Sequence, residues 1–312
     1  MAQKAPGKSH RKGLTLLQVA DMFKDEKTAK AWLTEQRWPE GPRCPYCDSP
    51  NVQSDIKHKT MTHRCRECEG KPMFTLRTGT VMEGSKLKYR IWAVGIYLFI
   101  TNIKGISSMK LHRELGIGQK AAWFMLHRLR KAYEAEVGPF SGTVEVDETF
   151  IGGKEKNKHN NKRSHIQGPS GKAVVIGMKD RVTNKVIAKP VPERTKQELQ
   201  GFISNHVSKK AMVYTDDHRS YIGLPFEHES VNHSVNEYVR EQAHTNGVES
   251  FWSMLKRGYY GTYHSISPKH LGRYVMEFSG RHNVRELDTI EQMGLLAKGM
   301  KGKRLTYREL VN

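Results

Sequence analysis

The stretch HTNGVESFWSMLKRG, residues 244–258, has the pattern of a helix with two unlike faces. At about 100° per residue, one apolar stripe is formed by Val248, Phe251, Trp252, Leu255 and Tyr259. The other side gathers Asn246, Glu249, Ser253 and Lys256. If the stripe is buried against a sheet, that side offers an amide, a carboxylate and an ammonium together, a set suited to a metal ion and a phosphate. The alternative is an ordinary amphipathic surface helix.

The composition indicates a polyanionic partner. The chain has 312 residues, enough for two or three domains, with 52 Lys and Arg against 32 Asp and Glu, a net charge of +20. Such an excess favours nucleic acid, because cations that neutralise phosphates release condensed counterions. A membrane surface would also attract this charge. However, no apolar run approaches the roughly 18 residues of a spanning helix, and the N-terminus lacks the apolar core of a signal peptide. We therefore expect a cytoplasmic, nucleoid-associated protein without a membrane partner.

The cysteines form two CxxC pairs, Cys44 with Cys47 and Cys65 with Cys68. Each CxxC turn directs two thiolates at one point, and two such turns complete the tetrahedral set that zinc prefers. Two disulfides are the alternative, which a basic chain without a secretion signal disfavours. Four cysteines leave no ligand position open, so the predicted zinc site is structural.

A first module, residues 14–80, surrounds these cysteines and follows a basic, disordered N-terminus at 1–13. Residues 52–65 alternate like a short hairpin, as in a zinc ribbon. Residues 14–38 have apolar side chains at helical spacing and end at a Trp-Pro step, which stops a helix. Zinc ribbons bind either DNA or protein, so the fold alone does not decide the partner.

Residues 81–138 have a helical pattern throughout. After a buried helix at 88–101, Ser107 can cap a helix that runs to about Leu115, and a Gly-Ile-Gly turn leads to a second helix from Gln119. This is the layout of a helix-turn-helix, whose second helix lies in a DNA major groove. A plain helical hairpin inside a bundle is the alternative. The side chains expected to contact DNA from the second helix are Gln119, Lys120, Arg128, Arg130 and Lys131.

The third region, residues 139–290, changes to the two-residue period of strands. The predicted strands are 143–151, 173–180 and 185–191, and a helix at 195–207 leads to a fourth strand at 211–217. Three antiparallel strands, a helix and a fourth strand that ends in acids are the order of the ribonuclease H-like fold. We therefore expect an α/β domain, with a mixed sheet flanked by helices, behind the zinc ribbon and the helical region.

Three acids stand where this fold would bring them together: Asp147 on the first strand, Asp216 at the end of the fourth, and Glu249 on the helix that follows. Two divalent ions about 3.5 to 4 Å apart need shared oxygen ligands. Each acid by itself could be an ordinary surface carboxylate. Glu148 and Asp217 are expected to be decoys or supporting residues, because a one-residue step along a strand turns the side chain to the opposite face.

Two further segments are strongly basic. The insert at 152–171 follows the first strand closely, which favours a mobile loop that grips a DNA backbone over a solvated linker. Its cations are Lys154, Lys156, Lys158, Lys162 and Arg163. The tail at 291–312 is basic too and is less informative.

Several phrases of the chain are specific: RWPEGPRCPYC from residue 37, FTLRTGTVMEGSKL from 74, VEVDETFIGG from 144, VYTDDHRSY from 213, and the run from 244 to 285. In these phrases the chain resembles bacterial insertion-sequence transposases of the DDE superfamily, in the subgroup with an N-terminal zinc ribbon. The likeness covers about residues 14 to 290. It implies a Mg²⁺- or Mn²⁺-dependent recombinase that cuts and rejoins DNA at the inverted repeats of its own mobile element.

The resemblance also implies residue roles. Asp147 and Asp216 match the first two metal-binding acids. Members of the subgroup have either Asn or Glu at the third position, and this chain has both Asn246 and Glu249; we expect Glu249, because an ionised carboxylate binds Mg²⁺ better than an amide. Lys256 matches the basic residue seven positions after that Glu, and with Arg257 it is expected to hold DNA.

The expected partners are the element ends and target DNA, bound by a homodimer or a higher oligomer because two ends must be held together. Two alternatives stay open. One is a domesticated relative that has lost catalysis and acts as a DNA-binding regulator. The other is a different ribonuclease H-like nuclease.

Overall fold

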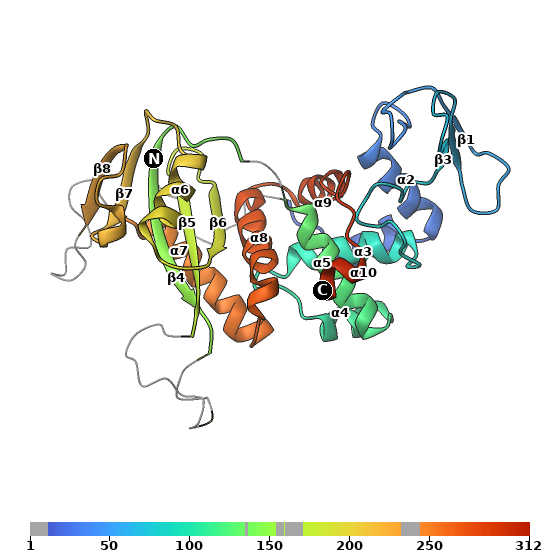
Figure 1. Cartoon of the computed structure of the whole chain (residues 1–312). Coiled ribbons are helices and arrows are strands. Elements are labelled where there is room, and N and C mark those ends of the chain that lie inside the picture. The colour runs from blue at the N-terminus through green and yellow to red at the C-terminus, as the bar shows by residue number, and fades with distance from the viewer. Residues whose placement is uncertain (1–11, 135–136, 154–158, 160–170, 232–243) are drawn as a thin grey trace. The chain divides into compact units, whose positions relative to one another are not determined.

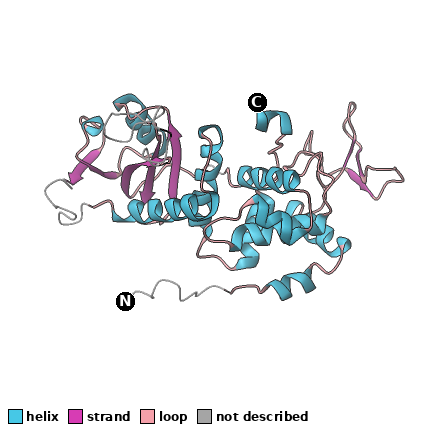
Figure 2. Cartoon of the chain, turned by 90° about the horizontal axis from the view of Figure 1, so that it is seen from below, coloured by secondary structure: helices cyan, strands magenta, loops and turns pink. Residues whose placement is uncertain are grey.

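The computed structural model describes residues 12–134, 137–153, 159, 171–231 and 244–312. The chain forms two compact units. Unit 1 takes the chain up to residue 135 together with residues 284–312, and unit 2 takes residues 136–283. Figure 1 labels the elements of both units, and Figure 2 distinguishes helices from strands by colour. No helix in the described ranges is long and apolar enough to cross a membrane.

Unit 1 is mainly helical and contains one small sheet. Its helices are α1 (Leu16–Met22), α2 (Glu26–Arg37), α3 (Tyr89–Thr101), α4 (Ser108–Leu115), α5 (Gln119–Ala132), α9 (Thr289–Lys298) and α10 (Tyr307–Val311). The antiparallel strands are β1 (Val52–Ser54), β2 (His63–Cys65) and β3 (Met73–Phe74). β1 and β2 are the predicted hairpin, and β3 adds a third strand to it.

The ribbon and the helices after it share one hydrophobic core. Phe74 from the ribbon, Trp92 from α3 and Leu126 from α5 belong to the same buried cluster. The expected boundary near residue 80 is therefore a change of secondary structure within one unit.

The predicted helical stretch at 14–38 is two helices, α1 and α2. The break lies at Asp25, whose side chain accepts a hydrogen bond from the backbone N–H of Thr28 at 2.8 Å and caps α2. A capping carboxylate satisfies an N–H that the first turn of a helix leaves unpaired. α2 ends at Arg37, before the Trp-Pro step, as predicted.

The two helices α4 and α5 and the glycine turn between them lie where the sequence predicts, which is consistent with a helix-turn-helix. Ser107 caps α4 by accepting from the N–H of Lys110 at 3.1 Å, and α4 ends at Leu115. Gly116 follows with φ of 61°, a left-handed conformation that glycine adopts without a steric penalty. The second helix begins at Gln119, as predicted.

The basic tail after residue 290 contains two helices, α9 and α10. α9 buries Met293 and Leu296 in the core of unit 1, and α10 buries Leu310. The basic composition of the segment concealed these apolar side chains, which recur at helical spacing and therefore face one side.

Unit 2 is built on a five-stranded sheet in the order β6-β5-β4-β7-β8 (Figure 1). β4 pairs antiparallel with β5 and parallel with β7, so the sheet is mixed. The strands are β4 (Thr143–Ile151), β5 (Ala173–Asp180), β6 (Val186–Val191), β7 (Met212–Asp216) and β8 (Glu227–Val231). The four predicted strands are confirmed, and β8 extends the sheet.

Helices cover both faces of this sheet. α6 (Lys196–His206) buries Leu199 and Phe202 against Val144 and Val146 of β4. On the opposite face, the helix α7 (Asn246–Gly258) packs with Ile151 of β4. η3 (Arg219–Tyr221) follows β7, η5 (Tyr259–Tyr263) continues α7, and α8 (Pro268–Val284) completes the α7 layer. This layered order is the predicted ribonuclease H-like fold.

Candidate active site and zinc site

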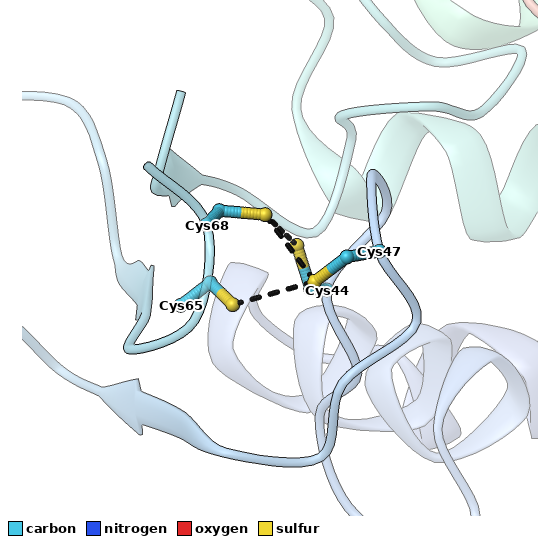
Figure 3. Close-up of side chains that lie close together, drawn as sticks. All are labelled: Cys44, Cys47, Cys65 and Cys68. Atoms are coloured by element: carbon cyan, nitrogen blue, oxygen red, sulfur yellow. Dashed lines mark hydrogen bonds between the residues drawn. The ribbon is translucent and has the colours of Figure 1, made fainter. Parts of the chain in front are cut away.

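The four cysteine side chains of unit 1 lie together, as Figure 3 shows. The sulfur of Cys68 lies 3.5 Å from that of Cys44 and 3.2 Å from that of Cys47, and the sulfurs of Cys47 and Cys65 are 3.7 Å apart. Zn–S bonds of about 2.3 Å in a tetrahedron place sulfurs about 3.8 Å apart. All four are free thiols, so the disulfide alternative is not realised. The cluster has the donors and the spacing of a structural zinc site.

The backbone supports the thiolates of this cluster. The N–H of Tyr46 lies 3.5 Å from the sulfur of Cys44, and the N–H of Glu67 lies 3.4 Å from that of Cys65. The hydrogen bond from Glu67 is the main cause that lowers the pKa of Cys65 to about 7. Since zinc binds the thiolate, the N–H of Glu67 favours the form of Cys65 that a metal needs.

The side chains expected to contact DNA from α5 do not share one surface. Gln119 and Lys120 are exposed at its N-terminus, and Lys131 is half-buried. Arg128 and Arg130 are 5% and 1% exposed, which corrects the prediction that they face a groove. Arg128 donates instead to the backbone carbonyls of Leu305 and Glu83. The spacing of these arginines along α5 did not predict their burial, because a helical repeat does not tell which side of the helix the core covers.

The basic insert falls almost entirely outside the described residues. Lys154, Lys156, Lys158, Lys162 and Arg163 are not among them. Their predicted contact with a DNA backbone stays a prediction.

Asp147 and Asp216 meet in unit 2 at one end of neighbouring parallel strands. Glu145 of β4 pairs with Tyr214 of β7, and each acid stands two residues further along its strand. Since side chains two residues apart share a face, both carboxylates belong to the α7 side of the sheet. Carboxyl oxygens of Asp147, Asp216 and Glu148 all lie within 4.8 Å of one another.

Of the two residues expected to be decoys or supporting residues, Glu148 lies beside the two aspartates. The side chain of Glu148 leaves β4 on the opposite face from Asp147, as predicted. Strand alternation puts the Cβ atoms of the two residues on opposite faces, but it does not keep the end of a long side chain away from its neighbour. Arg194, just before α6, donates to Oε1 of Glu148 at 2.6 Å and to Oδ2 of Asp216 at 3.2 Å. One guanidinium thus offsets part of the charge of two acids. Asp217 is exposed and lies outside the group, among the described residues.

Arg194 lies in a short connection without a recognisable motif, so its place in the site was not predictable from the sequence. No periodicity marks it, and only the folded chain brings it from the β6–α6 link to the ends of β4 and β7. Its contacts with two acids, Glu148 and Asp216, are therefore a tertiary feature.

Asp147 is half-buried in an acidic environment. Burial, followed by the charge of Glu148 and smaller effects of Asp216 and Glu249, raises the pKa of Asp147 to about 7. A nearby cation favours the ionised form of such a carboxyl group, so a proton and a divalent cation compete for Asp147. The site therefore favours a divalent cation over an empty, fully ionised state.

This pKa predicts a pH dependence of metal binding. Below pH 7 a proton competes with the cation for Asp147, so the apparent affinity for Mn²⁺ should fall by up to about tenfold per pH unit, and above pH 7 it should level off. The apparent affinity is measured by electron paramagnetic resonance of Mn²⁺ titrated with the protein at several pH values from 5.5 to 8.5. An affinity that is constant down to pH 5.5 would contradict the prediction.

α7 is anchored to the sheet at its N-terminus by Glu145. This carboxylate is 2% exposed; its Oε2 accepts from the N–H of Val248 at 2.9 Å, and its Oε1 accepts from Arg181 at 2.7 Å. A Cβ at Gly247 would lie 2.6 Å from Oε2, so glycine allows the close approach. The pairing neutralises a buried charge and satisfies an N–H that the first turn leaves unpaired.

The role of Glu145 as an anchor for α7 was not predicted either, although its position in the strand indicates that it needs a partner. It lies two residues before Asp147 and therefore on the same face of β4, between the apolar Val144 and Val146. A charged side chain within a strand that is buried on both sides needs a partner. Glu145 has two partners, Arg181 between β5 and β6 and the N–H of Val248 in α7.

The candidate third ligands lie on the first turn of α7. Asn246 and Glu249 are both exposed. The hydroxyl of Thr245 donates to Oε1 of Glu249 at 2.8 Å. Glu249 affects the pKa of Asp147 but lies outside the group of acids within 4.8 Å. Lys256, two turns later, is half-buried, and Arg257 is exposed.

Known proteins share these regions. The ISXO2-like transposase domain matches residues 139–283, and the transposase zinc-ribbon domain matches residues 24–71. A protein of Halobacterium salinarum, named as an uncharacterized protein in transposable element ISH50, is 26% identical over 276 residues, 84% of this chain and 92% of its own length. An uncharacterized transposase-like protein of Haemophilus influenzae is 31% identical over 121 residues, 38% of this chain and 95% of its own length.

A solved structure of a pre-cleavage Mos1 transpososome matches 67% of this chain and 79% of that chain at 11% identity, with a TM-score of 0.21. The ribonuclease H-like sheet with its acids and the preceding zinc ribbon define a DDE transposase by class. The chain belongs to the family of ISXO2-like transposases with an N-terminal zinc ribbon.

Proposed function

We propose that this protein is an active DNA transposase that binds the terminal inverted repeats of its insertion sequence and catalyses metal-dependent strand cleavage and strand transfer. The observation that carries the proposal is the convergence of Asp147 and Asp216, from β4 and β7, within 4.8 Å of each other and of Glu148. Neighbouring strands hold two carboxylates rigidly at the distance that a divalent cation requires.

The acids define what the site does. Asp147 and Asp216 would hold two Mg²⁺ or Mn²⁺ ions, which, when bound, supply Lewis acidity at the phosphodiester. Water attacks the phosphorus at an element end and the 3′ oxygen leaves. The freed 3′-hydroxyl then attacks a phosphodiester of target DNA in the same site. Both steps exchange one P–O bond for another, so no covalent enzyme intermediate and no Ser or Tyr nucleophile is needed.

The polar side of α7 completes the proposed site. Glu249, on its first turn, supplies a third carboxylate, and Lys256 lies seven residues further on the same side of the helix. An ammonium there would hold a phosphate next to the cut. The third ligand requires Glu249 to approach the two aspartates when cations bind, since its carboxylate lies outside their immediate group.

DNA recognition falls to the other parts of the chain. We assign the element ends to the zinc ribbon and to the exposed start of α5, where Gln119 and Lys120 lie, because recognition helices contact bases with their first residues. The net charge of +20 supports backbone contact. Since two ends must be held together, the active form is a dimer or a higher oligomer.

Two other functions fit the fold less well. A regulator that had lost catalysis would not need the acids, yet Asp147 and Asp216 converge. Another ribonuclease H-like nuclease would not need a zinc ribbon and a helix-turn-helix ahead of the sheet. The test is an assay with purified protein and DNA that carries the inverted repeats flanking the coding region, with and without Mg²⁺. Cleavage at the repeats only with Mg²⁺ supports the transposase, and cleavage of any DNA alike supports a general nuclease.

The third ligand can be assigned with two variants on α7. Glu249→Gln should lower Mg²⁺-dependent cleavage by about a hundredfold or more, because a charged ligand is lost, whereas Asn246→Ala should lower it by less than about tenfold. The comparison uses cleavage rates at several Mg²⁺ concentrations. If only Asn246→Ala inactivates the protein, the amide is the ligand and the assignment to Glu249 is wrong.

A further inference from the structure

The indole of Trp252 lies against the acidic site. Trp252 is 3% exposed, and its Nε1–H donates to Oδ2 of Asp147 at 3.0 Å. It stands on α7 three residues after Glu249, so the same helix carries this donor and the proposed third ligand. The sequence places Trp252 in the apolar stripe, where its ring does pack, but the stripe does not explain the hydrogen bond.

The space for the indole is created by Gly177. This glycine is the cross-strand partner of Asp147 on β5, and its own partner on β6 is the small Ala188. A Cβ at Gly177 would lie 2.5 Å from Cη2 and 2.7 Å from Cζ2 of Trp252. Contacts this short are not tolerated, so any side chain there would move the ring and its N–H. The small residues beside Asp147 therefore fix the place of the indole.

We infer that Trp252 is a positioning residue of the metal site, an inference that rests on the proposed function. Its N–H holds Oδ2 of Asp147 and leaves Oδ1 to a divalent cation. Groups that hydrogen-bond a ligating carboxylate set its orientation, and their loss typically costs about 10- to 100-fold in metal affinity or activity. An indole N–H only donates, so Trp252 orients the carboxylate without competing for the cation.

The same contact sets how closely α7 approaches β4. Glu145 anchors the first turn of the helix through Val248, and Trp252 anchors its middle through Asp147. With both ends of this stretch fixed to one strand, the first turn of α7, which carries Glu249, is held against β4. Trp252 thereby links the strand ligand and the helix ligand of the proposed site.

The test is Trp252→Phe in the zinc-loaded, full-length protein. Phenylalanine keeps an aromatic ring over Gly177 but has no donor. We expect Mn²⁺ binding, followed by electron paramagnetic resonance, to weaken about 10- to 100-fold. The Mg²⁺ concentration for half-maximal cleavage should rise by a similar factor, with cleavage restored close to the wild-type rate at saturating Mg²⁺. Gly177→Ala should weaken Mn²⁺ binding in the same direction, although it changes neither Asp147 nor Trp252.

Two controls separate the possible outcomes. Trp32→Phe makes the same exchange at a buried site of unit 1 and should bind Mn²⁺ like the wild type. Asp147→Asn should lose Mn²⁺ at this site, and if it does not, the proposed function itself fails. If Asp147→Asn loses Mn²⁺ but Trp252→Phe binds it normally, only the inference about Trp252 is overturned. A uniform drop in cleavage at every Mg²⁺ concentration, with unchanged half-saturation, would also overturn it, because that is the effect of lost packing.

Discussion

Asp147→Asn is expected to abolish Mg²⁺-dependent cleavage of the element ends while leaving their binding near the wild-type level. The amide keeps the size of the carboxylate but loses its charge. Lewis-acid stabilisation worth several kcal/mol is lost with the cation, which corresponds to a decrease in rate of about a thousandfold or more. Cleavage is measured on labelled DNA with the inverted repeats, and binding by gel shift of the same DNA without Mg²⁺.

Asp216→Asn should have the same effect, since the two aspartates share the site. The matched control is Asp217→Asn, which removes the same charge from the next residue, whose side chain is exposed. It should cleave like the wild type. Cleavage that persists in either Asp147→Asn or Asp216→Asn would remove that residue from the metal site, and a loss in Asp217→Asn equal to the others would show that net charge and not ligation is at stake.

Zinc loss is the second change with a large expected effect. Cys44→Ser combined with Cys65→Ser removes two of four ligands, and we expect zinc content to fall from one ion per chain to none. Structural zinc contributes about 10 to 16 kcal/mol in small zinc-finger peptides, comparable with or above the whole free energy of unfolding of a typical domain, about 5 to 15 kcal/mol. Cys44 and Cys65 belong to the core of unit 1, so that unit should lose its ordered ribbon and its specific binding of DNA ends.

Metal analysis and thermal unfolding check this outcome. Glu67→Gln, an exposed change between Cys65 and Cys68, is the matched control and should retain zinc. A double serine variant that is folded as stably as the wild type without metal would show that the ribbon does not need zinc. The core of unit 2 is formed by separate clusters of side chains, so we expect the unfolding of unit 2 to be affected less.

Local chemistry made the zinc ligands and the helix ends predictable. Cys44 and Cys47 are brought together by one turn, and the cap of α4 at Ser107 depends on residues three positions apart. Such features are set within a few residues and do not depend on the rest of the fold. The first two acids were also predictable, because strand alternation fixes the face of Asp147 and the end of a strand fixes Asp216.

Long-range contacts were not predictable in the same way. Arg128 was expected to face a DNA groove, but it donates to carbonyls of Glu83 and Leu305. The basic composition of the segment after residue 290 predicts a tail, but this segment forms α9, which packs into the core of unit 1. In both cases the sequence repeat gives the spacing of side chains along a helix. Which side of the helix the core covers depends on elements far away in the chain.

The sequence by itself determined that this protein carries the four-cysteine cluster of a zinc ribbon and the order of strands and helices of a ribonuclease H-like transposase. Both follow from residues near one another, through turns, caps and alternation. Only the tertiary structure decided that Glu148 joins the aspartates, that Arg194 bridges two acids and that Trp252 holds Asp147. The physical reason is that hydrogen bonds and charges act over a few ångströms in space, and side chains distant along the chain meet only when the sheet and its helices are packed.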